Sequence, residues 1–151
     1  MFEAYKNWDI PTNLNISDFQ WVDKTGKSPG EFVLGKGSYA EVKLCRNRDH
    51  KLFACKIIEK KKVTIHKMEI YIKQEIELHL KMSHRNILKL WGCGQDESNI
   101  YLFLDYCKNN CVYMYLKKKK RLKENASFTF FFQTALGNFF ILLRKSLHYF
   151  M

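Results

Sequence analysis

Apolar side chains recur at every second residue in two neighbouring stretches of the chain. The first stretch contains Val42 and Leu44, and the second runs from residue 52 to residue 58. A period of two places these side chains on one face of an extended strand. Residues 47–50 are polar and separate the two stretches, so the pattern predicts two strands joined by a turn.

The hydrophobic period becomes helical from Met68 to Met82. At about 100° per residue, Glu75 falls in the middle of the apolar face, whereas Glu77 falls opposite, beside lysines at i−4 and i+4. An unpaired carboxylate on an apolar face is costly, so we expect Glu75 to have a cationic partner. The apolar face that surrounds it in this projection comprises Met68, Tyr71, Ile72, Leu78, His79 and Met82.

Lys56 is the expected partner of Glu75. It shares the predicted strand face with Ala54 and Ile58, where an unpaired ammonium group is equally costly. Two inward-pointing groups of opposite charge predict one buried ion pair. A purely structural ion pair is the alternative interpretation.

Two glycines precede the first predicted strand. Gly35 and Gly37 have no side chain that would keep a bulky anion from the backbone, so the turn is a candidate phosphate cover. A dinucleotide-binding fingerprint would lead directly into a helix, but here the chain stays extended through Cys45. The pattern therefore favours a glycine turn between two strands.

The remaining apolar runs complete a predicted five-stranded antiparallel sheet. Residues 18–22 start the first strand, and residues 31–34 resume it after an inserted turn at 24–30. Further strands are predicted at 87–91 and 100–105, with a turn at 92–98 between them. Residues 1–30 as a whole are interpreted as a loose N-terminal extension.

Composition narrows the expected number of domains, the binding partners and the cellular compartment. The 151 residues suit one domain, and 46% hydrophobic content suffices for a core. The net charge of +11 is concentrated at 60–62 and 117–123, runs interpreted as solvated faces, so nucleic-acid binding is not predicted. The five cysteines form no C-x-x-C pair, which favours a reduced, intracellular protein, cytoplasmic or nuclear. No metal site is predicted, because the spacing of Cys93, Cys107, Cys111 and His84 matches no zinc motif.

The ordered motifs resemble those of a eukaryotic protein kinase, from Leu34 to about Phe150. The fold class expected from this resemblance is α+β, with a kinase small lobe at 31–107 and the first helices of an incomplete large lobe at 108–151. The wording around 74–90 and 99–116 is most similar to the Aurora and polo-like serine/threonine kinases. The motifs are the Gly-rich loop from Gly35 to Val42, the A-x-K strand at Ala54 to Lys56, the helix C glutamate Glu75, and His84 to Ile87 in place of H-P-N-I.

The resemblance implies an ATP site. The loop residues Gly35, Lys36, Gly37, Ser38, Tyr39 and Ala40 would cover the phosphates, and Lys56, held by Glu75, would contact the α and β phosphates. Leu34, Val42 and Ala54 would enclose the adenine, with Leu104 as gatekeeper and Asp105, Tyr106 and Cys107 as the hinge.

Four positions depart from the family pattern. Ala40 replaces the third glycine, and Arg85 replaces proline, both without an expected consequence. Asn110 and Cys111 stand where relatives carry glycine and a ribose-binding residue. One ribose contact is therefore expected to be lost.

The last third predicts a short helix at 112–116 and a long helix at 126–143. The family's H-R-D falls either at His148 to Phe150 or beyond Met151, and no D-F-G follows, so the base and the Mg²⁺ ligands of the family are absent from this sequence. We expect weak ATP binding at most and no phosphoryl transfer. The long helix is expected to expose phenylalanines and promote aggregation, and a membrane anchor is the less favoured interpretation.

Three hypotheses follow for the function. The first is a serine/threonine kinase in truncated form, which in its complete form would phosphorylate a protein substrate. The second is a non-catalytic module that binds nucleotide or a partner. The third is a basic binding or membrane-surface protein in which the glycine turn is incidental. The sequence predicts no oligomeric state.

Overall fold

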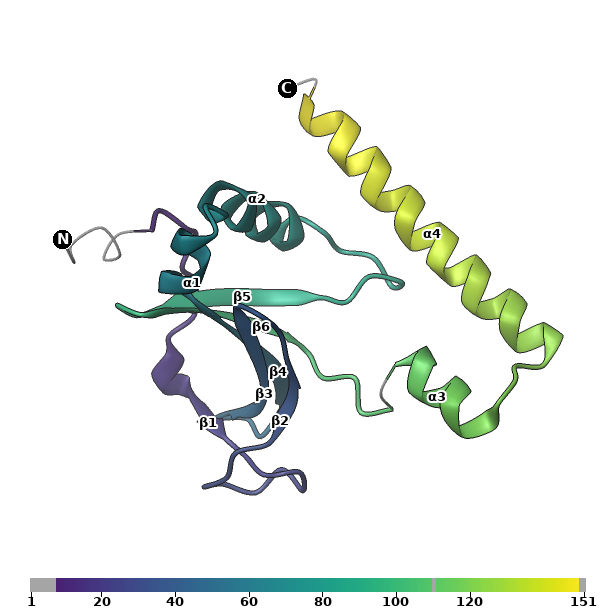
Figure 1. Ribbon diagram of the computed structural model, residues 1–151, viewed down its shortest axis with the longest axis horizontal. Coiled ribbons are helices and arrows are strands. Elements are labelled where there is room, and N and C mark those ends of the chain that lie inside the picture. Colours follow the sequence, from purple (N-terminus) through teal and green to yellow (C-terminus); the bar gives the residue numbers. More distant parts are fainter. Residues whose placement is uncertain (1–7, 110, 150–151) are drawn as a thin grey trace. The chain divides into compact units, whose positions relative to one another are not determined.

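The computed structural model describes residues 8–109 and 111–149 (Figure 1). The described chain divides into two compact units. The sheet unit comprises residues 8–81 and 89–106, and the helical unit comprises 82–88 and 107–149, with residue 110 outside the description.

The sheet unit is built on six antiparallel strands. The strand order is β1-β3-β4-β6-β5, and β2 also pairs with β3. One short 3₁₀ helix and two α-helices complete the unit. The elements are η2 (Ile16–Asp18), β1 (Phe19–Trp21), β2 (Val33–Lys36), β3 (Ala40–Asn47), β4 (Leu52–Glu59), α1 (Lys60–Ile65), α2 (Glu69–Leu80), β5 (Leu90–Gln95) and β6 (Asn99–Asp105).

The first strand of the predicted sheet is divided in two. β1 pairs with the end of β3, from Cys45 to Asn47, and β2 pairs with its beginning, from Glu41 to Lys43. The intervening turn is organised by Asp23, whose carboxylate accepts hydrogen bonds from the backbone of Thr25 and Lys27. The sequence predicted five strands with this interruption, and the structure has six because the two halves pair separately.

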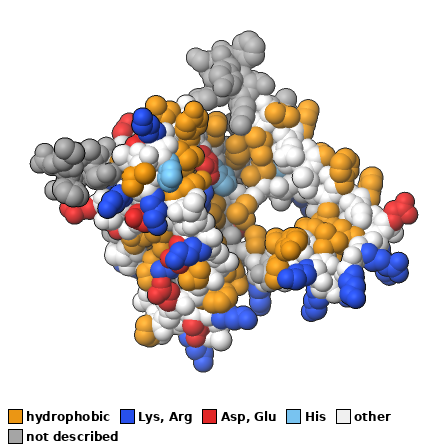
Figure 2. All heavy atoms as spheres, viewed as in Figure 1, with side chains coloured by type: hydrophobic (Ala, Val, Ile, Leu, Met, Phe, Trp, Pro, Cys, Tyr) orange, Lys and Arg blue, Asp and Glu red, His pale blue; other side chains and the backbone are white. Residues whose placement is uncertain are grey.

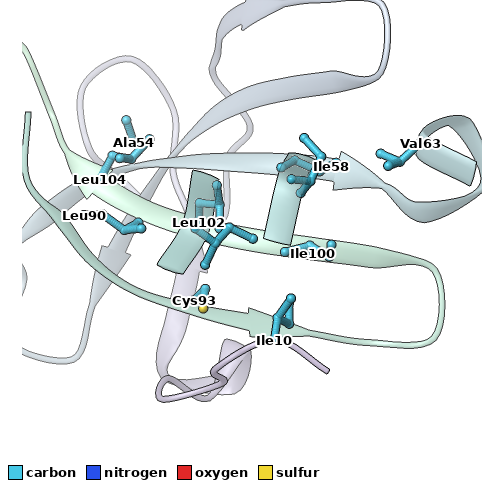
Figure 3. Packing of buried hydrophobic residues seen from close by; sticks show 11 residues of the cluster. Ile10, Ala54, Ile58, Val63, Leu90, Cys93, Ile100, Leu102 and Leu104 are labelled. Atoms are coloured by element: carbon cyan, nitrogen blue, oxygen red, sulfur yellow. The ribbon is translucent and has the colours of Figure 1, made fainter. Parts of the chain in front are cut away.

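Alternation along the central strands creates two buried clusters, one on each face of the sheet. Ala54 and Ile58 of β4 lie in the first cluster, which includes Ile72 and Ile76 of α2 (Figure 3). Phe53 and Cys55 point to the opposite face, where they pack with Phe103 and the partly buried Phe19. The predicted period of two is confirmed.

Helix α2 presents a different face to the sheet than the sequence predicted. Ile72 and Ile76 are its buried residues, while Tyr71 is 67% exposed. The midpoint between Ile72 and Ile76 lies about 80° from Glu75 around the helix. The projection omitted Ile76, and the opposite side of the predicted stripe, at Tyr71, is exposed. Glu75 is therefore at the margin of the buried face and not in its middle.

The predicted strand at 87–91 and the predicted turn at 92–98 were displaced. β5 begins at Leu90 and continues through both Gly92 and Gly94. The tight turn is confined to 96–98, where the Asp96 carboxylate accepts hydrogen bonds from the backbone of Ser98 and Asn99. The two glycines signalled a turn in the sequence, but in the structure they allow another segment of backbone to approach closely.

That segment belongs to the N-terminal region. Ile10 is 7% exposed and belongs to the cluster under α2, and the backbone of Asn13 and Leu14 hydrogen-bonds to Cys93 of β5. Residues 8–23 are therefore packed against the sheet, and the interpretation of 1–30 as a loose extension is wrong for them. Residues 1–7 lie outside the described chain.

The helical unit contains α3 (Val112–Lys119) and α4 (Glu124–Tyr149). Both predicted helices are confirmed. Within this unit His84 stacks on Phe140 at 5.0 Å between ring centroids, and a Cβ at Gly137 would lie 3.0 Å from the Asn86 carbonyl. The close approach of 84–86 to the middle of α4 explains why this helix has a glycine there.

Much of the apolar surface of α4 faces solvent, as expected from the sequence (Figure 2). Lysines follow one another at the end of α3. In the described residues, no helix meets the length and hydropathy needed for a membrane span. The large apolar side chains of α4 that are exposed are Phe128, Phe131, Phe132, Leu136, Phe139 and Leu142.

Candidate nucleotide-binding site

The strands align the predicted adenine-contacting and phosphate-contacting residues on one face of the sheet unit. Val42 is paired with Lys56, and Ala54 is paired with Leu104. Ala54 and Leu104 are each 9% exposed and pack in the cluster on the α2 side, where Val42 joins them in part. Leu34 on the edge strand β2 is 36% exposed. The sheet thus presents three apolar side chains beside one lysine.

The glycine turn joins β2 to β3. It is closed by a hydrogen bond from the Gly37 backbone N–H to the Ala40 carbonyl at 2.8 Å, and Lys36 and Ser38 are exposed. A Cβ on Gly35 would meet no described atom within 4 Å outside its chain neighbours, so packing within the described chain does not require glycine there. The open space beside Gly35 fits a turn whose partner is a ligand. Tyr39 is partly buried against the cluster under α2.

Lys56 and Glu75 form the predicted ion pair. The distance from Lys56 Nζ to Glu75 Oε1 is 3.3 Å, and the side chains are 24% and 52% exposed. The prediction of a buried pair is wrong in this respect, because Glu75 lies at the margin of the buried face of α2. An ion pair so exposed contributes at most about 1 kcal/mol to stability. Structural stabilisation is therefore a weak reason for the pair.

The end of β6 is fixed by a residue that sequence reasoning missed. Trp91 Nε1 donates a hydrogen bond to Asp105 Oδ1 at 2.6 Å, and the Asp105 backbone N–H donates to the Lys89 carbonyl at 3.1 Å. The ammonium groups of Lys51 and Lys89 lie 3.4 and 4.0 Å from the centroid of the Trp91 ring. The sequence carries no signal for this bond, because the bond depends on the pairing of β5 with β6.

The remaining hinge residues lie partly outside the sheet unit. Cys107 belongs to the helical unit and is exposed. Asn110, at the predicted loss of a ribose contact, lies outside the described residues. The structure therefore brings together the sheet-unit part of the predicted site, from Leu34 to Asp105.

A second network in the sheet unit surrounds Lys60, which the sequence placed in a solvated run. Lys60 is 1% exposed and donates hydrogen bonds to Gln95 Oε1 at 2.9 Å and to the Asp96 carbonyl at 2.6 Å. Burial lowers the pKa of Lys60 below its usual value, although the Asp96 charge opposes this. Burial also raises the pKa of Asp96, but hydrogen bonds from Tyr101, Asn99 and Ser98 and the charge of Lys60 outweigh it and leave that pKa lowered. The first residue of the lysine run is thus structural.

Only part of the predicted catalytic end of the chain lies within the described residues. The backbone of His148 and Tyr149 belongs to α4, and Phe150 lies outside the described residues. Among the described residues, no three His, Cys, Asp or Glu side chains come together as a metal site would require.

Comparison with known proteins agrees with this geometry. The model of the protein kinase domain matches residues 31–149. The Aurora kinase of Schizosaccharomyces pombe is 33% identical over 103 residues, which cover 68% of this chain and 29% of that protein. The Aurora kinase of Candida albicans is 31% identical over 136 residues, covering 89% of this chain and 24% of that protein.

A polo-like relative shows the same relationship. The serine/threonine-protein kinase plk-2 of Caenorhabditis elegans is 30% identical over 126 residues, which cover 83% of this chain and 20% of that protein. The chain spans less than a third of the length of each of these relatives. The match to the kinase domain extends over the glycine turn, Lys56, Glu75 and the end of β6, and the chain belongs to the protein kinase domain family.

Proposed function

We propose that the sheet unit binds ATP, as the small lobe of a serine/threonine protein kinase. The observation that carries the proposal is the pair of Lys56 and Glu75 on the same face of the sheet as Val42 and Ala54. An ion pair half exposed to solvent adds little stability, so holding the ammonium group in place for an anion is the better explanation of it.

Each group of residues has a distinct task in this proposal. The backbone N–H groups of the glycine turn cover the phosphates, and Lys56 neutralises charge on the α and β phosphates while Glu75 orients it. Val42, Ala54 and Leu104 supply an apolar slot for the adenine ring. The backbone of Asp105, the last residue of β6, supplies a polar contact to the base.

The reaction proposed for the whole protein is phosphoryl transfer from ATP to a serine or threonine hydroxyl of a protein, in an intracellular compartment. The 151-residue sequence contains no aspartate in an H-R-D or D-F-G motif to accept the hydroxyl proton or to hold Mg²⁺. We therefore propose that the 1–151 polypeptide binds ATP without transferring phosphate. The described residues assemble no cluster of metal ligands.

Thermal unfolding with and without ATP tests the proposal. A ligand that binds only the folded protein at about 100 times its Kd stabilises it by about 2.7 kcal/mol, which raises the midpoint measurably. Lys56→Met should abolish this shift, and Lys61→Met, which removes an exposed lysine from α1, should retain it. Equal shifts in both variants would refute binding through Lys56. A radiolabelled ATP assay with a generic protein substrate and kinase-free 1–151 polypeptide should show no transfer.

A further inference from the structure

Residues 8–14 contact both α2 and β5 in the sheet unit. We call this segment the N-terminal brace. It begins beside α2, where Asp9 Oδ2 lies 2.8 Å from Lys73 Nζ, and it ends on β5, where Leu14 hydrogen-bonds to Cys93. The purple segment that approaches α1 and α2 in Figure 1 belongs to it.

The brace lies along β5, the last strand in the order of the described sheet. The backbone N–H groups of Asn13 and Leu14 donate to the Cys93 carbonyl at 3.0 and 3.1 Å, and the Cys93 N–H donates to Asn13 Oδ1 at 2.9 Å. A Cβ on Gly92 would lie 2.4 Å from Asn13 Oδ1, and one on Gly94 would lie 2.8 Å from the Leu14 carbonyl. The glycines of β5 therefore make room for this particular segment.

The start of the brace is held by a directional hydrogen bond. Lys60 Nζ can only donate, so its 2.9 Å contact fixes the carbonyl oxygen of the Gln95 side chain toward it. The amide nitrogen of Gln95 must then point the other way, and it donates to the Trp8 carbonyl at 2.9 Å and to Thr12 Oγ1 at 3.3 Å. The buried Lys60 thus sets the orientation in which Gln95 binds the brace.

The brace also enters the core beneath α2. Ile10 is 7% exposed and belongs to one buried cluster with Ile72 and Ile76, the buried residues of α2 (Figure 3). The ion pair between Asp9 and Lys73 adds little, because the Asp9 side chain is 97% exposed. The burial of Ile10 in one cluster with Ile72 and Ile76 is therefore the stronger of the two links between the brace and the helix.

We propose that residues 8–14 position α2 so that Glu75 reaches Lys56. Ile10 and Gln95 are positioning residues in this proposal, which rests on the proposed role of Lys56 in nucleotide binding. The exposed pair of Lys56 and Glu75 is too weak to fix the helix by itself. Glu75 lies one turn from Ile72, on the helix whose buried face Ile10 helps to cover.

Hydrogen exchange of the 1–151 polypeptide separates a positioning role from a general structural one. Ile10→Ala should raise exchange in residues 69–80 on the order of tenfold, while exchange in β3 and β4 stays nearly unchanged. If only about a tenth of the molecules keep α2 in the orientation in which Glu75 reaches Lys56, the Kd for ATP rises about tenfold. Ile10→Val, which keeps most of the side chain, should restore both values.

Two further variants keep the test decisive. Gln95→Glu retains an acceptor for Lys60 but has no donor for the Trp8 carbonyl, so it should also increase exchange in α2, even if Ile10→Ala fails to fold. Ile16→Ala is the matched control, because Ile16 packs on the opposite face of the sheet, and it should leave exchange in α2 at the wild-type rate.

The outcomes distinguish this proposal from the proposed function. Unchanged exchange in α2 in Ile10→Ala and Gln95→Glu would overturn the brace, and so would faster exchange with an unchanged Kd for ATP. If the wild-type polypeptide gives no thermal shift with ATP, the proposed function fails. Exchange in residues 69–80 then decides by itself whether the brace holds the helix.

Discussion

Trp91 and Asp105 are joined by a 2.6 Å hydrogen bond from the indole nitrogen to the carboxylate. The bond links the start of β5 to the last residue of β6. The bond therefore fixes the side chain of Asp105, the residue whose backbone we propose contacts the nucleotide base. The orientation of this residue is thus set from the neighbouring strand.

Replacing Trp91 by phenylalanine should reduce the free energy of unfolding by about 1 kcal/mol. The variant loses a hydrogen bond to a charged acceptor but keeps an aromatic face for Lys51 and Lys89, and partial exposure limits the cost. Urea denaturation followed by fluorescence of the other tryptophans measures the change. Asp105→Asn retains an oxygen acceptor and should cost less than Trp91→Phe; an equal or larger loss in Asp105→Asn would contradict this explanation.

Glu75→Gln should weaken ATP binding several-fold while changing the free energy of unfolding by less than about 1 kcal/mol. The pair is half exposed, so its loss costs little stability, but the Lys56 ammonium loses the group that orients it. Titration calorimetry and urea denaturation give the two quantities. Glu77→Gln removes a carboxylate from the same helix without touching Lys56 and should leave the Kd unchanged. A similar Kd in Glu75→Gln and wild type would show that the pair has no part in binding.

Local patterns in the sequence predicted much of the sheet unit. Alternation in β4 was sufficient to place Ala54, Lys56 and Ile58 on one face, because every second residue of a strand points the same way. The two faces of β4 lie in different buried clusters, as this alternation requires. The ion pair of Lys56 and Glu75 was predicted from the cost of isolated charges, and the structure contains it. Its burial was predicted wrongly, because helix α2 buries the side with Ile72 and Ile76 and exposes the side with Tyr71, which the apolar pattern alone does not distinguish.

Long-range contacts explain what sequence patterns missed. Gly92 and Gly94 resembled a turn because the segment that needs them, residues 13–14, is about 80 positions away in the chain. Lys60 resembled a surface residue because its acceptors, on β5 and the following turn, are 35 and 36 positions away in the chain. Trp91 carried no signal for Asp105, because the bond depends on the pairing of β5 with β6.

Protonation of Asp96 in acid should make the protein less stable. The pKa of this carboxyl is lowered in the folded protein, so its contribution is complete above the unfolded value of about 3.8 and is lost as the pH falls through the folded pKa. Asp96→Asn removes this contribution and should be about 1 kcal/mol less stable at pH 7. The difference from wild type should shrink as the pH falls from about 5 toward 3, measured by urea denaturation. A constant difference across this range would contradict the assignment.

Gly94→Ala should destabilise the sheet unit by about 2 kcal/mol. The added Cβ would lie 2.8 Å from the Leu14 carbonyl, and backbone cannot move aside as easily as the end of a side chain. Gly35→Ala is the matched substitution, because its Cβ meets no described neighbour within 4 Å, and it should change stability by no more than about 0.5 kcal/mol. Chemical denaturation of both variants at one pH measures the contrast. Equal stabilities would mean that residues 13–14 do not approach β5 this closely.

The exposed phenylalanines of α4 should cause the 1–151 polypeptide to self-associate. Phe131 is 73% exposed and is one of several large apolar side chains on the solvent-facing surface of that helix. Covering an apolar surface of this kind with a second copy is favourable, by about 25 cal/mol for each Å² removed from water. Phe131→Glu should therefore shift sedimentation velocity profiles toward the monomer. Gln133→Glu adds the same carboxylate at an exposed position of α4 without removing a phenylalanine, so it controls for charge. A monomeric wild-type polypeptide, or an equal shift in Gln133→Glu, would exclude association through these side chains.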